Sequence, residues 1–388
     1  MNILVIAFEF PPEGGGIGVY AYQIAKNLSD QGQNITAIAL TSRVDESEIN
    51  AFDRKQNFKI YRVKQINQRL LSILNRLYVT IKVLCKERFD FLYVAHMPAG
   101  VLGMIGKYIF RTPYAIVGHG TEILLNDKKN YTRLVYNHSD VVIVNSNYTK
   151  QLFLDKNINK PIHVVFPGGD HHQFDPHKYK GRRNELREKL GLSHKFIVMT
   201  TGSISERKDH ITVVKAIKKI SQDYKDICYI IVGDGPYKPQ VDKTIAELNL
   251  KEYVLFYGFA KIADLPQLYD ICDIFILNSK IDRIGDVEGF GIVLIEAGLM
   301  EKPVIGVLKT GMEDAVENNK SGILVNMNDP DDTANAILKF YKNRKLCVSM
   351  GKYARQRALS KFTWEISGKH TYSILHNYNE RLIKAGKN

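Results

Sequence analysis

The sequence of 388 residues is poor in the features that mark secreted or membrane-spanning proteins. It has four cysteines and no CxxC pair: Cys85, Cys228, Cys272 and Cys347. Scattered thiols of this kind indicate a reducing compartment and argue against a zinc site. The start, MNILVIAFEFPP, lacks the basic segment and long apolar run of a signal peptide, and no window reaches the roughly 18 apolar residues of a membrane span. We therefore expect a cytoplasmic protein, or one peripheral to the cytoplasmic face of the membrane.

Acidic residues are fewer than basic ones, 41 against 54, and part of the deficit is local. Between Arg54 and Arg88 there are ten Lys or Arg residues and one acid, Glu87. In residues of about 68–89, apolar positions recur at helical spacing with basic residues between them, which predicts a basic amphipathic helix able to bind an anionic membrane. The alternative is a domain helix that packs its apolar face on a sheet and exposes its basic face to water, and both can hold. Aromatic and basic residues do not alternate as in a stacking platform, so no nucleic acid partner is expected.

Short β-branched runs alternate with helical stretches along nearly the whole chain. The first half contains ILVIAF, ITAIAL, FKIYRV, FLYVAH, YAIVGH, VVIVNS and IHVVFP, and the second FIVMTTGS, YIIVGDG, VLFYGF, IFILNS, PVIGVL and GILVN. Near-continuous apolar strands joined by helices predict parallel sheets covered on both faces. Because the length exceeds what one core usually supports, we expect the α/β class with two doubly wound Rossmann-like domains, each binding ligands at the carboxyl ends of its strands.

The polar, basic segment 171–195 contains Pro176 and Gly181 and is expected to be the linker. It separates a first domain, residues 1–170, from a second, residues 196–364. The three histidines of the segment lack a matching Cys or carboxylate cluster, which favours a solvated linker over a metal site. They are His171, His172 and His177.

The stretch EGFGIVLIEAG places Glu288 and Glu296 eight positions apart, the second in an aliphatic run without a nearby Lys or Arg. Charged side chains are seldom buried without a partner. Gly289 and Gly291 around Phe290 predict a tight turn into a helix beginning near Gly291, with Glu288 before it and Glu296 inside it. The free N–H groups of a helix start favour an anion, and a ligand diol such as ribose would satisfy Glu296. The alternative is a capping glutamate and a satisfied core glutamate.

Two further stretches follow strands and favour phosphate binding. In TGSISERKDH, residues 201–210, Arg207 and Lys208 at a helix start predict a diphosphate clamp. The alternative, an exposed basic helix start, is unfavourable against the helix dipole. In PPEGGGIGVYAYQIA, residues 11–25, Gly16 opens a helix and lets backbone approach a phosphate. Residues 14–21 also fit the GxGxxA pattern of a nicotinamide site, with Arg43 as a partner for a 2′-phosphate. This interpretation is the weaker one because no acid ends the second strand.

Two other motifs have simpler explanations. In VGHGTE, His119 and Glu122 follow a strand at its carboxyl end, where a lone histidine is more often a structural hydrogen-bonder. The triplet DPD at residues 329–331 looks like a metal-binding DxD, but it precedes the helical stretch TANAILKFY, so a helix cap is expected.

Together these motifs resemble the retaining glycosyltransferases of family 4, which have the GT-B fold. The resemblance covers essentially the whole chain and includes PPEGGGIGVYAYQIAKNL, HGTE, VNSNYTK, FPGGDHHQF, GSISERKDH, VGDGPYKPQV, YGFAKIADLPQLYDICDIFILNS and EGFGIVLIEAG. FTWE resembles the closing segment of the family, after which a last helix, about 365–388, returns to the N-terminal domain. The resemblance implies a nucleoside-diphosphate sugar as donor, and neither cofactor nor metal, since lysine and backbone dipoles supply the positive field.

The resemblance also implies that residues 1–170 form the acceptor domain, with the acceptor entering against the glycine loop, and that residues 196–364 bind the nucleotide sugar. It further implies roles for individual residues. Glu288 would hydrogen-bond the donor sugar and support positive charge at its anomeric carbon, Glu296 would bind the ribose, and Lys208 would neutralise the leaving diphosphate. His119 would touch the transferred sugar from the N-terminal domain. The remaining contacts would be backbone N–H groups, at Gly16, Phe290 and Gly291.

One position departs from the family pattern. Ser203 stands where an arginine usually follows the glycine of the diphosphate loop, and Arg207 is expected to substitute for it. The expected reaction moves a hexose from GDP-mannose or a UDP-hexose to a hydroxyl of a lipid-linked glycan or glycolipid, in cell-surface polysaccharide synthesis. Two alternatives are a catalytically silent homologue that binds nucleotide or membrane, for which Ser203 is the support, and a nicotinamide-dependent oxidoreductase.

Overall fold

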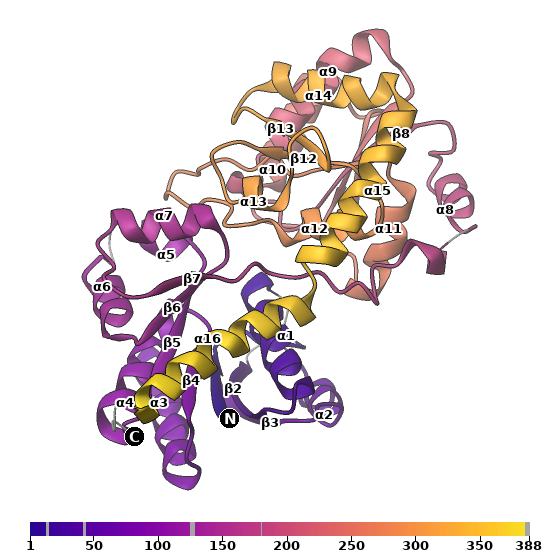
Figure 1. Ribbon diagram of the computed structural model, residues 1–388. Coiled ribbons are helices and arrows are strands. Elements are labelled where there is room, and N and C mark those ends of the chain that lie inside the picture. Colours follow the sequence, from indigo (N-terminus) through magenta and orange to yellow (C-terminus); the bar gives the residue numbers. More distant parts are fainter. Residues whose placement is uncertain (13–14, 42–43, 125–128, 180, 385–388) are drawn as a thin grey trace. The chain divides into compact units, whose positions relative to one another are not determined.

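The computed structural model describes residues 1–12, 15–41, 44–124, 129–179 and 181–384. The chain divides into two compact units, one formed by Met1–Pro167 with Trp364–Asn388 and the other by Gly168–Thr363 (Figure 1). Each unit is built on one parallel sheet. In β1, for example, every residue after the first is buried, as expected for a strand covered on both faces.

The sheet of the first unit has the strand order β3-β2-β1-β4-β5-β6-β7. Its strands are β1 (Asn2–Ala7), β2 (Asn34–Thr41), β3 (Lys59–Lys64), β4 (Phe91–Val94), β5 (Tyr114–Gly118), β6 (Val141–Val144) and β7 (Ile162–Val164). Its helices are α1 (Gly16–Asp30), α2 (Glu46–Asp53), α3 (Arg69–Lys86), η1 (Met97–Ala99), α4 (Gly100–Phe110), α5 (Thr121–Leu124), α6 (Lys129–His138), α7 (Asn147–Asp155) and α16 (Trp364–Lys384). The order reverses at β1, which places the ligand-binding switch point of the fold at the carboxyl ends of β1 and β4.

The second unit repeats this topology with the order β10-β9-β8-β11-β12-β13. Its strands are β8 (Phe196–Thr201), β9 (Ile227–Val232), β10 (Val254–Gly258), β11 (Ile274–Ile276), β12 (Val304–Val307) and β13 (Gly322–Val325). Its helices are η3 (Pro176–Tyr179), α8 (Arg183–Lys189), η4 (Glu206–Lys208), α9 (His210–Asp223), α10 (Lys238–Glu247), η5 (Ile262–Asp264), α11 (Leu265–Ile271), α12 (Ile292–Leu299), α13 (Met312–Ala315), α14 (Pro330–Lys342) and α15 (Arg344–Lys361). The predicted strands and their parallel pairing are thus confirmed in both units.

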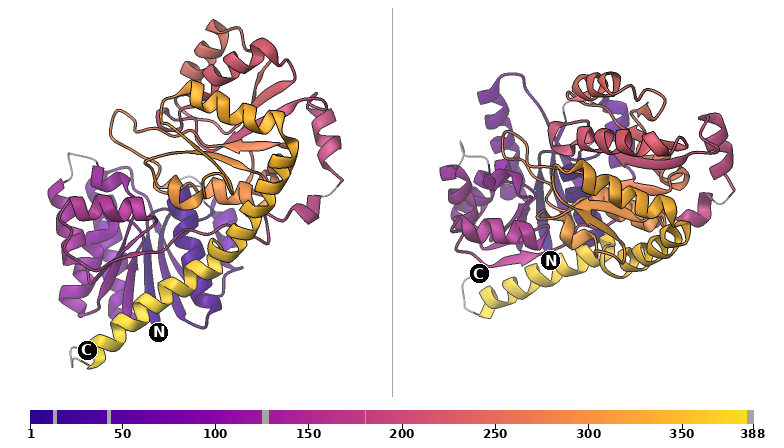
Figure 2. Two further views of the ribbon diagram at one scale, coloured as in Figure 1. Left: turned by 45° about the horizontal axis from the view of Figure 1, so that its top comes forward. Right: turned by 90° about the horizontal axis from the view of Figure 1, so that it is seen from above.

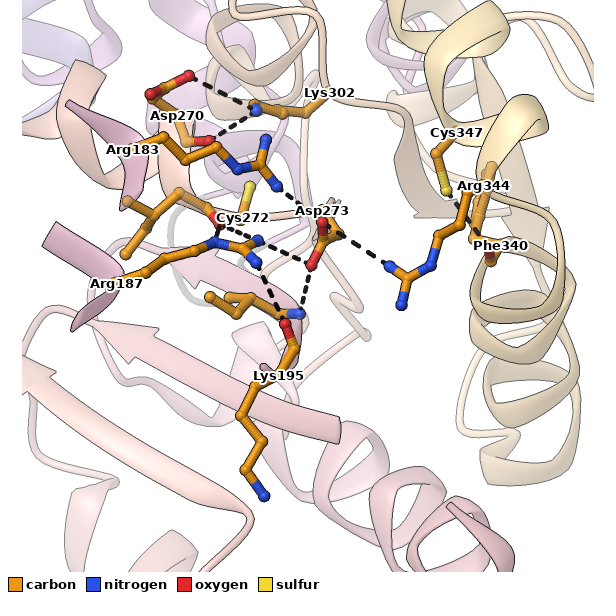
Figure 3. Close-up of polar contacts among 12 residues, drawn as sticks. Arg183, Arg187, Lys195, Asp270, Cys272, Asp273, Lys302, Phe340, Arg344 and Cys347 are labelled. Atoms are coloured by element: carbon orange, nitrogen blue, oxygen red, sulfur yellow. Dashed lines mark hydrogen bonds and ion pairs between the residues drawn. The ribbon is translucent and has the colours of Figure 1, made fainter. Parts of the chain in front are cut away.

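Residues 171–195, expected to be a linker, are instead part of the second unit. Helix α8 is held by Arg183 and Arg187, whose guanidinium groups donate to the Asp273 carboxylate at 2.7 and 2.9 Å (Figure 3). Arg187 also donates to the backbone carbonyl of Ile271 at 2.9 Å and is almost fully buried. The polar composition of this segment predicts a solvated linker, but an arginine that is paired with a carboxylate can be buried although it is polar.

The last helix, α16, is clustered with the first unit and contacts α1 (Figures 1 and 2). The two helices approach closely at Gly368, where an added Cβ would lie 2.7 Å from the Cβ of Asn27. The Ser367 hydroxyl donates to the backbone carbonyl of Phe166 at 2.6 Å. A side chain at Gly368 would therefore force α16 away from α1.

Helix α3, the predicted basic amphipathic helix, packs differently from expectation. Its buried residues are Ser72, Thr80, Val83 and Leu84, whereas several large apolar side chains face solvent: Leu70, Leu71, Ile73, Leu74 and Tyr78. Leu70 is 69% exposed. The exposed face of α3 is therefore apolar as well as basic, and not basic alone. Among the described helices, none combines the length and apolar character that crossing a bilayer requires.

Candidate functional site

The loop before α12 has the predicted local structure. Gly291 is the N-cap of α12 with φ of 87°, a left-handed conformation that favours glycine. Glu288 therefore lies in the loop and Glu296 lies inside the helix. The loop is held against the segment after β12, where Gly311 donates its N–H to the Glu288 carbonyl at 3.1 Å. An added Cβ on Gly311 would lie only 1.8 Å from the Gly289 carbonyl oxygen, so the two backbones are in direct contact.

The cationic loop after β8 brings two predicted residues to Glu288. Arg207 and Lys208 lie in the short 3-10 turn η4, and Asp209 separates them from the start of α9. The Lys208 Nζ and the Arg207 Nη1 each lie 2.6 Å from the same carboxylate oxygen, Glu288 Oε2. The Arg207 Nε also pairs with Asp286 at 3.0 Å. Three residues predicted for the donor site thus form one ionic cluster.

The charges in this cluster are only slightly exposed, with 13% of the Glu288 side chain and 12% of the Lys208 side chain accessible. Burial alone would raise the pKa of the Glu288 carboxyl, but the charges and hydrogen bonds of Lys208 and Arg207 outweigh it and lower that pKa to about 2. Burial lowers the pKa of Lys208, against the attraction of Glu288. Glu288 is therefore a carboxylate at neutral pH, and two cations stand beside it at the carboxyl end of the sheet.

Glu296 finds its partner on another helix. The Tyr269 hydroxyl, on α11, donates to Glu296 Oε2 at 2.8 Å and lies 2.9 Å from the Thr201 hydroxyl at the end of β8. Burial raises the pKa of the Glu296 carboxyl to about 7 despite the hydrogen bond from Tyr269, and the nearby Asp170 carboxylate adds to the rise. A carboxyl group held this way is poised between its two protonation states at physiological pH.

Two predicted residues, His119 and Gly16, lie in the first unit. The His119 backbone N–H donates to Glu122 at 2.7 Å, and its ring Nε2 is 2.9 Å from the Ala95 carbonyl oxygen. A carbonyl oxygen only accepts hydrogen bonds, so the His119 Nε2 carries a hydrogen and donates it to Ala95. Gly16 begins α1, and an added Cβ there would meet nothing within 4 Å. Gly14 and Arg43, invoked for a nicotinamide site, lie outside the described residues.

Comparison with known proteins decides the family. Residues 14–173 match the model described as Glycosyltransferase Family 4, and residues 182–357 match the model of Glycosyl transferases group 1. The chain belongs to glycosyltransferase family 4. Its two Rossmann-like units form the GT-B fold, which it shares with HepE of Anabaena, solved in complex with UDP and glucose. That structure has a TM-score of 0.80 and 22% sequence identity, with 97% of this chain and 100% of that chain covered.

Two curated relatives match this glycosyltransferase along nearly their full length. One is the GDP-mannose-dependent alpha-(1-6)-phosphatidylinositol monomannoside mannosyltransferase of Mycobacterium tuberculosis, 26% identical, with 94% of this chain and 95% of the relative covered. The other is the N-acetyl-alpha-D-glucosaminyl L-malate synthase of Bacillus anthracis, also 26% identical, with 93% and 94% covered. The names of these relatives specify a lipid acceptor for the first and a small hydroxy acid for the second.

The structure of the glycosyltransferase adds contacts that the sequence did not reveal. Asp286 holds Arg207, Tyr269 holds Glu296, and Glu122 holds His119 and also accepts the Tyr136 hydroxyl at 2.7 Å. Of these partners, only Glu122 could have been found from the sequence, because it lies in the HGTE motif. The DPD triplet is a helix cap as predicted, because the Asp329 carboxylate accepts the N–H groups of Asp331 and Asp332.

Proposed function

We propose that this enzyme transfers a hexose, with retention of configuration, from GDP-mannose or a UDP-hexose to a hydroxyl of a lipid-linked glycan or glycolipid in cell-surface polysaccharide synthesis. The observation that carries the proposal is that Lys208 and Arg207 both form ion pairs with Glu288 beside the start of α12. A buried pair of cations and a helix start suit a diphosphate, and the ionised carboxylate suits a sugar that develops positive charge.

In this mechanism the donor diphosphate replaces the Glu288 carboxylate as the partner of Lys208 and Arg207. Without donor, Lys208 and Arg207 neutralise Glu288. A bound diphosphate pairs with these two cations in part. Glu288 can then accept a hydrogen bond from a hydroxyl of the sugar. The C1–O bond to the diphosphate then breaks while the acceptor oxygen bonds to C1 on the same face, and the acceptor proton passes to the leaving phosphate oxygen. Lys208 and Arg207 stabilise the charge that the diphosphate gains, so they act mainly in the transition state.

The donor and acceptor in the proposal take support from the relatives. The name of the mycobacterial relative specifies GDP-mannose and a phosphatidylinositol monomannoside, and HepE was solved with UDP and glucose. The bases differ between these proteins, which leaves GDP-mannose and UDP-hexoses as candidate donors. Calorimetric titration with UDP-, GDP- and ADP-sugars, followed by transfer assays on lipid-linked acceptors, tests the proposal.

One donor should bind and support turnover in the presence of EDTA, since the cations of the site replace a metal and no cofactor is required. Lys215→Ala, an exposed lysine on α9, serves as a matched control for Lys208→Ala. Binding without transfer or hydrolysis would favour a silent homologue. Loss of turnover in EDTA that Mn²⁺ or Mg²⁺ restores would contradict metal independence. Tight binding of a reduced nicotinamide cofactor would favour the oxidoreductase.

Helix α3 supports the proposal that the enzyme binds an anionic membrane surface. It combines exposed apolar side chains with Arg69 and Lys82, which is the pattern of helices that lie at the lipid interface. The protein should sediment with anionic liposomes and be released by salt. Replacement of Arg69, Arg76 and Lys82 by Gln should weaken this binding, and equal binding to neutral liposomes would contradict an electrostatic contribution.

A further inference from the structure

A cavity of about 710 Å³ lies in the first unit between the end of β1, the segment leading into α3, and helices α3 and α4. Its volume falls within the range of roughly 300–1,000 Å³ typical of small-molecule sites. Most of its lining is apolar, and two arginines also line it. The residues that carry the argument are Phe8, Leu77, Val101, Ile105, Arg69 and Arg76. None of the described residues that line it is acidic.

Arg76 is the unusual residue of this cavity. Its guanidinium carbon lies 4.5 Å from the centre of the Phe8 ring, and its Nη2 donates to the Ser72 hydroxyl at 3.2 Å. Its Nε is buried and has no hydrogen-bond partner within the described ranges. Burial lowers the pKa of Arg76, and no carboxylate of the described chain offsets this. A partly buried guanidinium in this state is a site for an anion.

Another arginine of the same unit shows the contrast. Arg62 is also close to aromatic rings, but its guanidinium forms two bonds to the Asp53 carboxylate at 2.6 and 3.1 Å. The positive charge of Arg62 is therefore paired with a carboxylate inside the protein. No carboxylate among the described residues pairs with Arg76, and the apolar walls of the cavity would surround an anion that binds there.

A chain of contacts links the cavity to His119. The Phe8 ring, which stacks on Arg76, also meets the His96 ring edge-on at 5.0 Å between centroids. His96 directly follows Ala95, whose carbonyl oxygen accepts from His119 Nε2. Phe8, His96 and Ala95 thus connect Arg76 to the histidine that, by family resemblance, touches the transferred sugar.

We propose that this cavity binds the acceptor, and that the acceptor is an amphiphile in which a phosphate joins an alkyl chain to the sugar. The phosphate binds Arg76, because the guanidinium fork matches phosphate geometry. The chain lies on the apolar walls formed by α3 and α4 and continues toward the exposed leucines of α3, and the sugar points toward His119. This inference rests on the proposed function, from which it takes the existence of a lipid acceptor.

The test uses monomeric decyl phosphate, below its micelle concentration, as the probe in calorimetry on the full chain. Decanol lacks the anion, and inorganic phosphate lacks the chain. Decyl phosphate should bind more tightly than either. Arg76→Gln should weaken its binding by about 10- to 100-fold, the effect of removing one charge-assisted hydrogen-bonding group. Arg76→Lys should restore only part of it. Val101→Trp, which changes a side chain 41% exposed at the cavity wall, should block binding without disturbing the core.

Lys86→Gln is the matched control, since it removes one positive charge from the last turn of the same helix, outside the cavity. It should leave the affinity for monomeric decyl phosphate unchanged. Equal binding to wild type and Arg76→Gln, equal binding of decanol and decyl phosphate, or equal binding of inorganic phosphate would each overturn the inference. Nucleotide-sugar binding, measured on the same samples, is a separate readout. If neither wild type nor any variant binds a nucleotide sugar, the proposed function is contradicted. The decyl phosphate measurements still decide whether the cavity binds an alkyl phosphate.

Discussion

Asp273 and Glu288 are both carboxylates held by cations in the second unit, but they differ in where they stand and in what holds them. Asp273 directly precedes β11, at the amino end of the strand, and its partners come from distant parts of the chain. They are Arg183, Arg187, Arg344 and the backbone N–H of Ile197 (Figure 3). Glu288 stands on the carboxyl side of β11, and both of its cations come from one turn.

This difference separates a stabilising cluster from a candidate site. Both oxygens of Asp273 are engaged, one of them by a backbone N–H at 2.8 Å, so the cluster ties α8, β8 and α15 together. Lys208 and Arg207 instead converge on one oxygen of Glu288, at the end of the sheet where α/β folds bind ligands. Ion pairing alone does not indicate function. Function is indicated by the position of the pair relative to the sheet, and by whether a ligand could replace the carboxylate as the partner of the cations.

The largest expected effect concerns folding. Asp273→Asn removes the charge that Arg187 is buried against, and leaving a buried cation unpaired costs about 3–5 kcal/mol of unfolding free energy. Urea denaturation should show this loss, while nucleotide affinity of the remaining folded protein should be unchanged. A matched change at the other cluster, Glu288→Gln, should destabilise less. If Asp273→Asn unfolds like wild type, the two clusters are not different in kind.

The next effect concerns catalysis. Lys208→Ala should lower turnover by about 10²–10³-fold, the loss seen when one preorganised group is removed from a site that stabilises developing charge. The midpoint of its urea transition should move far less than that of Asp273→Asn. Turnover at saturating donor is the measurement, with Lys215→Ala as the control. Wild-type turnover in Lys208→Ala would remove the cluster from the mechanism.

Arg207 should have a smaller effect. Asp286 already shares its charge, so Arg207→Ala should lower turnover by about tenfold, less than Lys208→Ala. Ser203 stands on the same loop and is exposed, so the double variant Ser203→Arg/Arg207→Ala should recover part of the lost rate. Turnover of the two variants at saturating donor is compared. If Arg207→Ala matches wild type, the family's missing arginine is replaced by some other group.

The smallest effect is a pH dependence of donor binding. The pKa of Glu296 is raised from 4.5 to about 7, so in the free protein this carboxyl is protonated below that pH. If the ribose binds the carboxylate, affinity for the nucleotide sugar should fall as pH drops below 7, by at most about tenfold per unit. Nucleotide sugars are the right probe because their diphosphate does not titrate in this range. Glu296→Gln should abolish the dependence, and Tyr269→Phe should shift it to higher pH. A flat profile in wild type would contradict the ribose role.

Local sequence patterns predicted most of the fold. Strand runs and the glycines around Phe290 act through neighbouring residues, and β1–β13 and the Gly291 turn follow from them. The partners of charged side chains could not be predicted in this way. Tyr269 reaches Glu296 from another helix, and Arg187 buries its charge against Asp273 across 86 positions. Such pairs depend on tertiary packing, which a local pattern does not specify. For the same reason, helical periodicity located α3 but not the face it exposes.

The central claim is that Glu288 acts on the sugar while its cations act on the diphosphate. The most direct test measures turnover and nucleoside-diphosphate affinity for Glu288→Ala on one preparation, with Glu296→Ala beside it. The account predicts that Glu288→Ala loses most turnover and binds the nucleotide nearly as wild type does, whereas Glu296→Ala mainly loses affinity. Undiminished turnover in Glu288→Ala would contradict the account.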